Sequence, residues 1–314
     1  MIAPTKNDIV KAYSIVKQYA HCTPVLTSQS VSKILGCNAY FKCENFQKVG
    51  AFKFRGASNA VFSLSEDLAQ KGVCTHSSGN HAAALALAAS MRGIPAYIVM
   101  PENAPAIKRK AVEGYGAKIF TCESTQEARE RELKKVQADT GATFIHPYEN
   151  FHVICGQGTA SLELLQEVTD LQAIITPVGG GGLFSGTLIY TKETNPKIEV
   201  YAGEPQNADD AFRSLRDGVL YPSVQPNTIA DGLRTSLCPL TLSVIQRYAN
   251  GILTVSEEAI VEAMRLVWER MKIIIEPSSA VPVATIMQNR GVFEGKKVGI
   301  IISGGNVDVE KLPF

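Results

Sequence analysis

The chain has 314 residues, of which 45% are apolar, so it can build one large or two moderate globular domains around hydrophobic cores. Its 31 basic and 30 acidic residues give a net charge of +1 without a strongly basic stretch, which argues against nucleic acid as a partner. No apolar run approaches the roughly 20 residues of a membrane-spanning helix, and residues 1–8 lack the apolar core of a signal peptide, so we predict a cytoplasmic protein without membrane contact.

Apolar runs of strand length alternate with helical patterns along the chain. The predicted strands are 96–100, 118–122, 143–146, 173–178, 198–202 and 297–303. The helix predicted at 124–139 starts with Ser124 and Glu127 at capping-box spacing, and the helix at 256–272 starts with Ser256 followed by two acids. This alternation predicts an α/β fold, in which helical crossovers join parallel strands and cover both faces of the sheets.

Two polar segments, 63–72 and 147–156, are the candidate crossings between two lobes. We therefore predict that residues 1–70 and 150–314 form a large domain. Residues 71–149 would then form a small domain inserted into it.

Segment 42–57, KCENFQKVGAFKFRGA, places Lys53 between two phenylalanines with Arg55 beside it. Partial burial and a positive neighbour both lower the pKa of a lysine, which makes its neutral amine available for a Schiff base. An ordinary solvated lysine is the alternative.

Segment 75–89, THSSGNHAAALALAA, has small polar residues followed by an alanine-rich helix that is apolar on nearly every side. This helix is predicted to be buried. Its N-terminal mouth at 77–80 offers hydroxyls, an amide and free backbone N–H groups, which together suit a substrate carboxylate. An ordinary serine cap is the alternative.

Segment 173–187, AIITPVGGGGLFSGT, joins an apolar strand to a helix through four glycines. Residues without a Cβ let several backbone N–H groups turn toward one anion, and the helix N-terminus adds its own, so we predict a phosphate site. The spacing matches neither GxGxxG nor GxxxxGK[ST], which argues against a Rossmann dehydrogenase or an NTPase. A flexible glycine turn is the alternative.

Segment 297–308, KVGIIISGGNVD, is a predicted buried strand that ends in Ser303 and a turn of two glycines. Ligands bind parallel sheets at the carboxyl ends of their strands, so this hydroxyl is a candidate ligand contact.

Taken together and in this order, the four segments resemble the fold-type II pyridoxal-phosphate enzymes, most closely the serine racemase and serine/threonine dehydratase group. The resemblance extends over nearly the whole chain and includes GQGT at 156–159, GEPQNADD at 203–210 and ERMKIIIEP at 269–277. It implies two lobes, each with a twisted, mostly parallel sheet flanked by helices, of which the large one binds pyridoxal phosphate. It also implies a homodimer.

The resemblance assigns roles to residues of the four segments. Lys53 would hold the cofactor as a Schiff base, and the phosphate would be bound by Gly179, Gly180, Gly181, Gly182 and Leu183. Asn80 would contact the phenolic oxygen, with Asn150 as a weaker candidate, and Ser303 would bond the pyridine nitrogen. The substrate would be bound by Ser77, Ser78, Gly79, Asn80, His81 and Arg129.

Racemisation requires an acid/base group on each face of a planar intermediate. Lys53 serves one face, and Ser78 resembles the opposite-face base of the serine racemases. Because the serine at 303 cannot keep the pyridine protonated as a carboxylate would, loss of a β-hydroxyl competes with racemisation. We therefore predict a racemase that interconverts L- and D-serine and also dehydrates serine to pyruvate and ammonia.

Two other functions stay open. Arg129 aligns with an arginine that approaches a substrate-side carboxylate in relatives, and 3-hydroxyaspartate dehydratases also carry the paired serine. On this alternative, the chain would be a threo-3-hydroxyaspartate or L-threonine dehydratase without significant racemisation. The third possibility is a protein that binds the cofactor without turnover.

Segment 203–210 resembles the divalent cation site of the family, with carboxylates from Glu204 and Asp210 and the backbone carbonyl of Ala208. Oxygen ligands suit Mg²⁺, with Ca²⁺ or Mn²⁺ as alternatives. The acids could instead cap a helix that starts near residue 207.

Activation by ATP is not expected from the resemblance. The residues that stand where ATP-activated racemases carry polar contacts are Gln29, Val49 and Ala83. Only Lys272 and Asn306 match that pattern.

Overall fold

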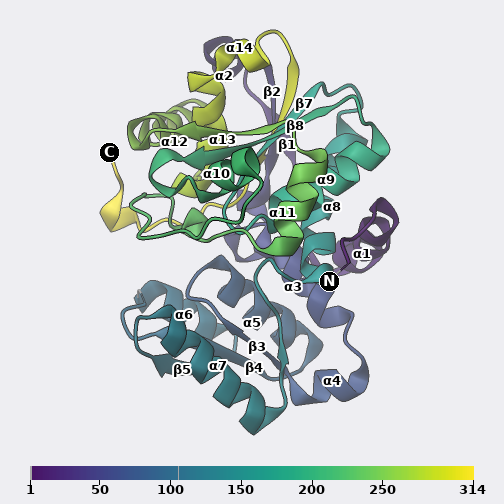
Figure 1. Cartoon of the computed structure of the whole chain (residues 1–314), viewed down its shortest axis with the longest axis vertical. Helices are drawn as coiled ribbons and strands as arrows, with labels where there is room; N and C mark the ends of the chain where they lie inside the picture. Colours follow the sequence, from purple (N-terminus) through teal and green to yellow (C-terminus); the bar gives the residue numbers. More distant parts are fainter. Residues whose placement is uncertain (1, 105) are drawn as a thin grey trace.

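The computed structural model describes residues 2–104 and 106–314 and has two lobes, each with its own sheet (Figure 1). Within these residues the larger sheet has six strands in the order β1-β2-β10-β7-β8-β9. They are β1 Val25–Thr27, β2 Asn38–Cys43, β7 Ala173–Pro177, β8 Glu199–Pro205, β9 Gly251–Val255 and β10 Lys297–Ile302. Strand β1 runs antiparallel to β2, and the other neighbours are parallel. Strand β10 therefore lies inside the sheet, between β2 and β7.

The sheet of the small lobe has four parallel strands in the described part of the chain, in the order β5-β4-β3-β6. They are β3 Val73–His76, β4 Ala96–Pro101, β5 Lys118–Cys122 and β6 Thr143–Phe144. One continuous stretch of sequence supplies them all, which supports an inserted small domain. Its boundaries at 71 and 149 stay a prediction. Phe54 and Val61, which belong to the earlier helix Lys53–Phe62, also pack into the small lobe's core.

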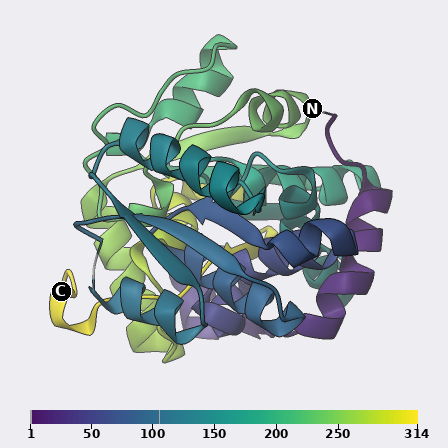
Figure 2. The ribbon, with the colours of Figure 1, turned by 90° about the horizontal axis from the view of Figure 1, so that it is seen from below.

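Helices cover both faces of each sheet, as Figure 2 shows for the small lobe. In the large lobe α2, α12 and α13 pack on one face and α1, α8, α9 and α11 on the other. The helices are α1 Lys6–Tyr19, α2 Gln29–Leu35, α3 Lys53–Phe62, α4 Glu66–Lys71, α5 Asn80–Arg92, α6 Ala106–Gly114, α7 Gln126–Thr140, α8 Phe151–Glu167, α9 Gly182–Thr194, α10 Asp210–Asp217, α11 Pro239–Tyr248, α12 Glu257–Met271, α13 Pro277–Gln288 and α14 Arg290–Phe293. The predicted α/β architecture is confirmed.

Strand β10 shows why these apolar runs become buried strands. Ile300 and Ile302 point into the core under α12 and α13, whereas Ile301 points into the core under α8 and α9. Successive side chains of a strand face opposite sides, so a strand covered on both faces has a continuous apolar sequence.

The predicted strands are all present, with ends that differ by a few residues, whereas β1, β2, β3 and β9 are not among the predictions. Ser256 caps α12 as predicted, since its Oγ accepts a hydrogen bond from the N–H of Ala259 at 3.3 Å. The predicted cap of α7 is wrong by one residue. Thr125, and not Ser124, accepts the hydrogen bond from the N–H of Ala128. Among the described helices, none has the length and apolar character needed to cross a membrane.

Candidate active site

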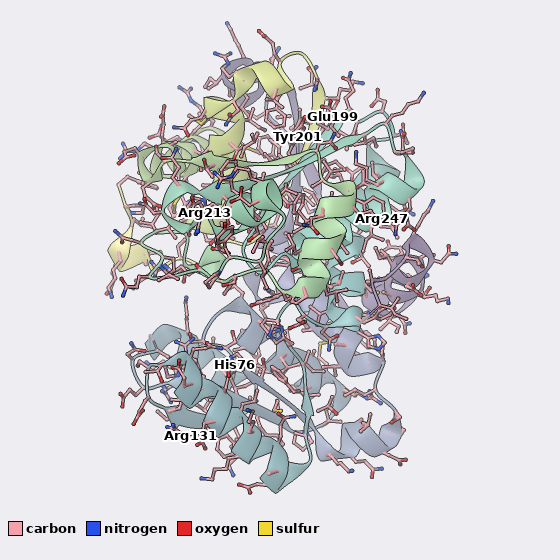
Figure 3. All side chains as sticks on the ribbon, viewed as in Figure 1. His76, Arg131, Glu199, Tyr201, Arg213 and Arg247 are labelled. Atoms are coloured by element: carbon pink, nitrogen blue, oxygen red, sulfur yellow. The ribbon has the colours of Figure 1, made fainter. Side chains whose placement is uncertain are left out.

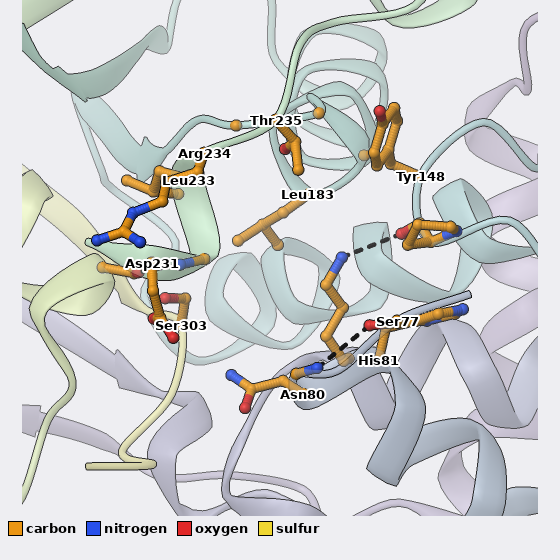
Figure 4. A pocket seen from close by; sticks show the side chains of 18 of the residues that line it. Ser77, Asn80, His81, Tyr148, Leu183, Asp231, Leu233, Arg234, Thr235 and Ser303 are labelled. Atoms are coloured by element: carbon orange, nitrogen blue, oxygen red, sulfur yellow. Dashed lines mark hydrogen bonds between the residues drawn. The ribbon is translucent and has the colours of Figure 1, made fainter. Parts of the chain in front are cut away.

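The four chemistry-bearing segments meet at one cavity of about 580 Å³ between the lobes. The predicted site residues that line it are Lys53, Ser77, Ser78, Gly79, Asn80, His81, Arg129, Gly179, Gly180, Gly181, Gly182, Leu183 and Ser303. Figure 4 shows Ser77 and Asn80 on one side of the cavity, with Leu183 and Thr235 across from them. Strands β7 and β10 both end at this cavity, which is the edge where parallel sheets bind ligands.

The glycine loop between β7 and α9 has no room for side chains. A Cβ added to Gly180 would lie 2.2 Å from the ring of Tyr148, and one added to Gly181 would lie 2.8 Å from Leu237. Gly181 also has a φ of +85°, in the region that favours glycine. Helix α9 begins here without a side-chain cap, so the N–H groups of its first turn have no acceptor within the helix. This loop fits a phosphate group.

Lys53 is the first residue of α3, and its Nζ donates a hydrogen bond to the carbonyl oxygen of Pro147 at 3.0 Å. Burial lowers the pKa of Lys53 to about 8, although the negative charge of Glu276 opposes the shift. The neutral amine that a Schiff base requires is therefore available near neutral pH. The lowered pKa is as predicted, but Arg55 is not its cause, because this guanidinium pairs with two buried carboxylates instead.

The mouth of α5 presents Asn80 in a fixed orientation. Its Nδ2 donates to both carboxylate oxygens of Glu276 at 3.1 Å, and its Oδ1 accepts from Nδ2 of Asn306 at 2.9 Å. No side chain caps this helix, so the serine-cap alternative is wrong. The Ser78 hydroxyl and the first-turn N–H groups therefore stand at the cavity, where they suit a carboxylate.

Ser303 follows directly after β10 and is 2% exposed. Its Oγ lies 2.9 Å from Oγ of Ser279, which also bonds the backbone of Gly304. A neutral hydroxyl held in this way can donate to or accept from a pyridine nitrogen. The lysine, the glycine loop and this serine together fit pyridoxal phosphate.

Glu276 lines the cavity but was not singled out from the sequence. Burial raises the pKa of its carboxyl to about 7, despite the hydrogen bond from Asn80. The sequence signal for Glu276 is its place directly before Pro277. Proline is favoured as the first residue of a helix, and Pro277 is the first residue of α13.

His146 also lines the cavity without having been predicted. Its Nδ1 accepts a hydrogen bond from the N–H of Glu149 at 2.9 Å, so the neutral ring carries its proton on Nε2. Burial lowers the pKa of His146 to about 4, which keeps the ring neutral at pH 7. The ring of His76 lies 6.3 Å away, on the side of the small lobe that faces the large lobe (Figure 3). No local sequence pattern marks either histidine.

Arg129 reaches the cavity from α7 in the small lobe. Its Nε is buried without a hydrogen-bond partner among the described residues. Buried donors of this kind are normally paired, so the position suits an anionic group of a ligand.

Asn150 is not among the residues that line the cavity. Its Oδ1 accepts a hydrogen bond from the N–H of Val153 at 3.0 Å and thereby caps α8. Of the two asparagines considered for the cofactor, the structure brings only Asn80 to the cavity.

The predicted cation ligands Glu204, Ala208 and Asp210 lie around the start of α10 and are not part of the cavity lining. The carboxylate of Glu204 accepts hydrogen bonds from the N–H groups of Ala211 at 2.9 Å and Phe212 at 2.7 Å. Glu204 therefore caps α10, which is the alternative that the sequence left open.

Asp210 has no such role. It is 1% exposed, and neither carboxylate oxygen has a hydrogen-bond partner among the described residues. Burial raises the pKa of Asp210 to about 6, despite the nearby Ser223 side chain, and raises that of Glu204 well above its usual range. Residues 2–104 and 106–314 contain no cluster of three or more His, Cys, Asp or Glu arranged for a metal. The unpaired carboxylate nevertheless fits a cation held by oxygen ligands.

The model of the family described as pyridoxal-phosphate dependent enzyme matches residues 16–304, and the chain belongs to this family. The serine racemase of Dictyostelium discoideum is 51% identical, with 99% of this chain and 98% of the relative covered. The beta-hydroxyaspartate dehydratase of Paracoccus denitrificans (strain Pd 1222) is 47% identical, with both chains covered completely. The crystal structure of the Dictyostelium racemase matches with a TM-score of 0.94 and 52% identity, over 97% of this chain and 99% of that one. The fold-type II architecture is confirmed.

Proposed function

We propose that this enzyme interconverts L- and D-serine and also eliminates the hydroxyl of serine to give pyruvate and ammonia. The observation that carries the proposal is that Lys53 and Ser78 line one cavity together with the glycine loop. The relative named serine racemase, which shares half of its residues with this chain, supports the same reading.

Residues of the cavity would hold the cofactor at three points. The backbone N–H groups of the glycine loop would bind the phosphate, Asn80 the phenolic oxygen and Ser303 the pyridine nitrogen. Bound pyridoxal phosphate supplies an electron sink that stabilises negative charge at the substrate α-carbon. The neutral hydroxyl of Ser303 does not hold a proton on the pyridine nitrogen, so more of this charge stays near the α-carbon and loss of the β-hydroxyl competes with reprotonation.

Lys53 and Ser78 would divide the transfer of the α-proton between two faces of the substrate. With a pKa of about 8, the Lys53 amine can accept a proton on one face near neutral pH. The Ser78 hydroxyl at the mouth of α5 would give or take a proton on the other face, where the helix N-terminus stabilises its anionic form.

Arg129 supports a second activity, the dehydration of threo-3-hydroxyaspartate. Its unpaired Nε would bind the additional carboxylate of this substrate. The relative named beta-hydroxyaspartate dehydratase matches along the full length of the chain. L-threonine lacks this carboxylate and would not use the Arg129 contact.

The deciding experiment incubates the purified enzyme with L-serine and, separately, with L-threo-3-hydroxyaspartate. D-serine is measured by chiral chromatography and the keto acid by a coupled assay. We expect both D-serine and pyruvate from L-serine. Keto acid from hydroxyaspartate without any D-serine would replace the racemase proposal with the second activity.

Two variants separate the roles of the cavity residues. Ser78→Ala is expected to abolish racemisation of L-serine and to leave elimination, because only racemisation needs the second face. Arg129→Met is expected to reduce turnover of hydroxyaspartate and to spare serine. Equal loss of racemisation and elimination in Ser78→Ala would contradict the two-face assignment.

We also propose that Glu204, Asp210 and the carbonyl of Ala208 bind Mg²⁺, with Ca²⁺ or Mn²⁺ as alternatives. The unpaired, buried carboxylate of Asp210 supports this site. The homodimer, the cytoplasmic location and the lack of activation by ATP stay predictions.

A further inference from the structure

Four charged side chains form a buried cluster below the first turn of α3, on the side away from the cavity lining. They are Lys42 of β2, Glu44 directly after it, Arg55 of α3 and Glu163 of α8, and we call them the α3 anchor. None of the four is more than 5% exposed. The two positive and two negative charges of the α3 anchor balance, which is the condition under which charges are tolerated in a protein interior.

Arg55 is the centre of the α3 anchor. Its Nε and Nη2 donate to the two oxygens of Glu44 at 2.6 and 2.8 Å. Its Nη1 and Nη2 donate to the two oxygens of Glu163 at 2.9 and 2.6 Å. Nη1 also donates to Oγ1 of Thr159 at 3.2 Å. Bidentate pairs of this kind fix the guanidinium in position and orientation, because the guanidinium and the carboxylate are both planar.

The backbone of α3 is held at the same place by the GQGT segment of α8. The N–H of Gly56 donates to Oε1 of Gln157 at 3.1 Å. A Cβ added to Gly156 would lie 2.5 Å from the carbonyl oxygen of Arg55. Helices α3 and α8 therefore approach more closely than side chains at these positions would allow, and this accounts for a sequence motif to which the cavity assigns no role.

Arg55 and Lys53 lie on opposite sides of α3. Residues two apart on a helix are rotated by about 200°, so a guanidinium fixed beneath the helix leaves the lysine directed away from it. Lys53 begins α3, and no side chain caps this end of the helix. The α3 anchor thus helps to fix how the first turn is rotated, together with the bond of Gly56 to Gln157 and the backbone bond from the N–H of Phe52 to the carbonyl oxygen of Ser303 at 2.9 Å.

We propose that Arg55 is a positioning residue for cofactor capture: through α3, it holds Lys53 with its amine in the cavity and against the carbonyl oxygen of Pro147. Rotation of the first turn would carry this amine toward solvent. The amine would then keep its proton at neutral pH and react more slowly with an aldehyde. The proposal rests on the cofactor of the family and not on the substrate, so its test is independent of the serine assay.

Lys42 provides a matched control within the α3 anchor. Its Nζ donates to Glu163 at 2.6 Å and to the carbonyl oxygen of Thr23 at 2.5 Å, but Lys42 belongs to β2 and does not bond α3. If the α3 anchor only stabilises the fold, loss of Lys42 and alteration of Arg55 have the same kind of effect. If Arg55 positions Lys53, only the change at Arg55 affects the amine.

The experiment compares Arg55→Lys with Lys42→Met. Arg55→Lys keeps the positive charge but loses the bidentate hydrogen bonds to the carboxylates. For each variant, the cofactor is removed and then returned, and the rate of capture is followed by the absorbance of the bound chromophore between pH 6.5 and 9.5. Thermal unfolding of the same samples measures stability. Capture by Arg55→Lys at pH 7.5 is expected to fall by about eightfold, which at this pH corresponds to a rise of the Lys53 pKa from about 8 to about 9.

Lys42→Met is expected to lower the melting temperature but to capture the cofactor within about twofold of the unaltered enzyme. Equal capture defects in the two variants, or a less stable Arg55→Lys with unchanged capture, would overturn the proposal. Should Arg55→Lys not fold, Thr159→Val decides instead. It nearly keeps the shape and removes the hydrogen bond that Nη1 donates to Thr159, together with the bond from Oγ1 of Thr159 to the carbonyl oxygen of Gly156 at 2.6 Å. At least about a twofold loss of capture is expected, and unchanged capture would refute positioning.

Discussion

The carboxylate of Asp210 lowers the stability of the protein when it is charged, because it is buried without a partner among the described residues. Its pKa is about 6 in the folded protein, against an ordinary value of 3.8, so the folded state binds more protons between these two values. The stability that this group contributes therefore falls as the pH rises from 3.8 to 6. It stays at its lowest above pH 6, which is where a bound cation would neutralise the charge.

Asp210→Asn is expected to raise the free energy of unfolding by roughly 1 to 3 kcal/mol at pH 7 without divalent cations, because it removes the buried charge. Added Mg²⁺ is expected to stabilise the unaltered protein at pH 7.5, much less so at pH 5, and to have no effect on the variant. Urea unfolding with and without Mg²⁺ at both pH values measures this. Equal stabilisation of protein and variant by Mg²⁺ would place the cation elsewhere.

At the scale of elements, the loop between β7 and α9 depends on having no side chain at Gly180. Gly180→Ala is expected to lower the free energy of unfolding by about 1 to 3 kcal/mol and to weaken cofactor retention, because its Cβ would lie 2.2 Å from the ring of Tyr148. Urea unfolding and dialysis of the bound cofactor measure the two effects.

Further variants show whether this contact is the cause. Gly180→Ala is expected to cost less stability when it is introduced into Tyr148→Ala than when it is introduced into the unaltered protein, since the ring is then absent. Gly114→Ala is the control, because a Cβ there has no neighbour within 4 Å, and it is expected to cost no stability. An equal cost of Gly180→Ala in the two backgrounds would contradict the steric explanation.

Local patterns predicted the elements that carry the chemistry. Four glycines between an apolar strand and a helix are visible over fifteen residues, as is the alanine-rich helix that begins at Asn80. Resemblance then placed Lys53 and Ser303 at one site, and the structure brings them to one cavity. The roles given to them stay proposals.

The remaining features depend on residues far apart in the sequence. Strand β2 contains Lys42, whose charge argues against a buried strand unless its partner is known. That partner, Glu163, is 121 residues further along the chain. In the same way, the resemblance gave Asn150 a role at the cofactor, whereas its bond to Val153 uses it to cap α8. Such pairings are set by tertiary packing, which no local pattern reports.

At the scale of the whole molecule, an ion pair joins the lobes at the rim of the cavity. Nζ of Lys108 on α6 lies 2.6 Å from Oδ2 of Asp231 in the large lobe, and both side chains remain partly exposed. Exposed pairs add little to stability, at most about 1 kcal/mol. We therefore expect loss of this pair to change substrate binding in the cavity more clearly than it changes the free energy of unfolding.

Lys108→Met is expected to change the free energy of unfolding by less than about 1 kcal/mol and to raise KM for the substrate by roughly two- to fivefold, because the two lobes lose one bond between them beside the cavity. Steady-state kinetics and urea unfolding measure the two quantities. Lys297→Met is the control, since its pair with Asp170 has similar exposure but lies within the large lobe. A similar rise of KM in both variants would argue against a specific role of the pair between the lobes.

The interior position of β10 affects how the chain folds during its synthesis on the ribosome. Strand β2 ends at Cys43 and β7 at Pro177, so both leave the ribosome long before β10, which begins at Lys297 and pairs with both. Until then the growing chain exposes two unpaired edges, which can pair with other chains. Ser303 arrives last of the residues proposed to bind the cofactor, so a nascent chain would have no complete site for the cofactor that would stabilise it. Translation that pauses between β7 and β10 therefore exposes this protein to aggregation more than a pause before β7 does.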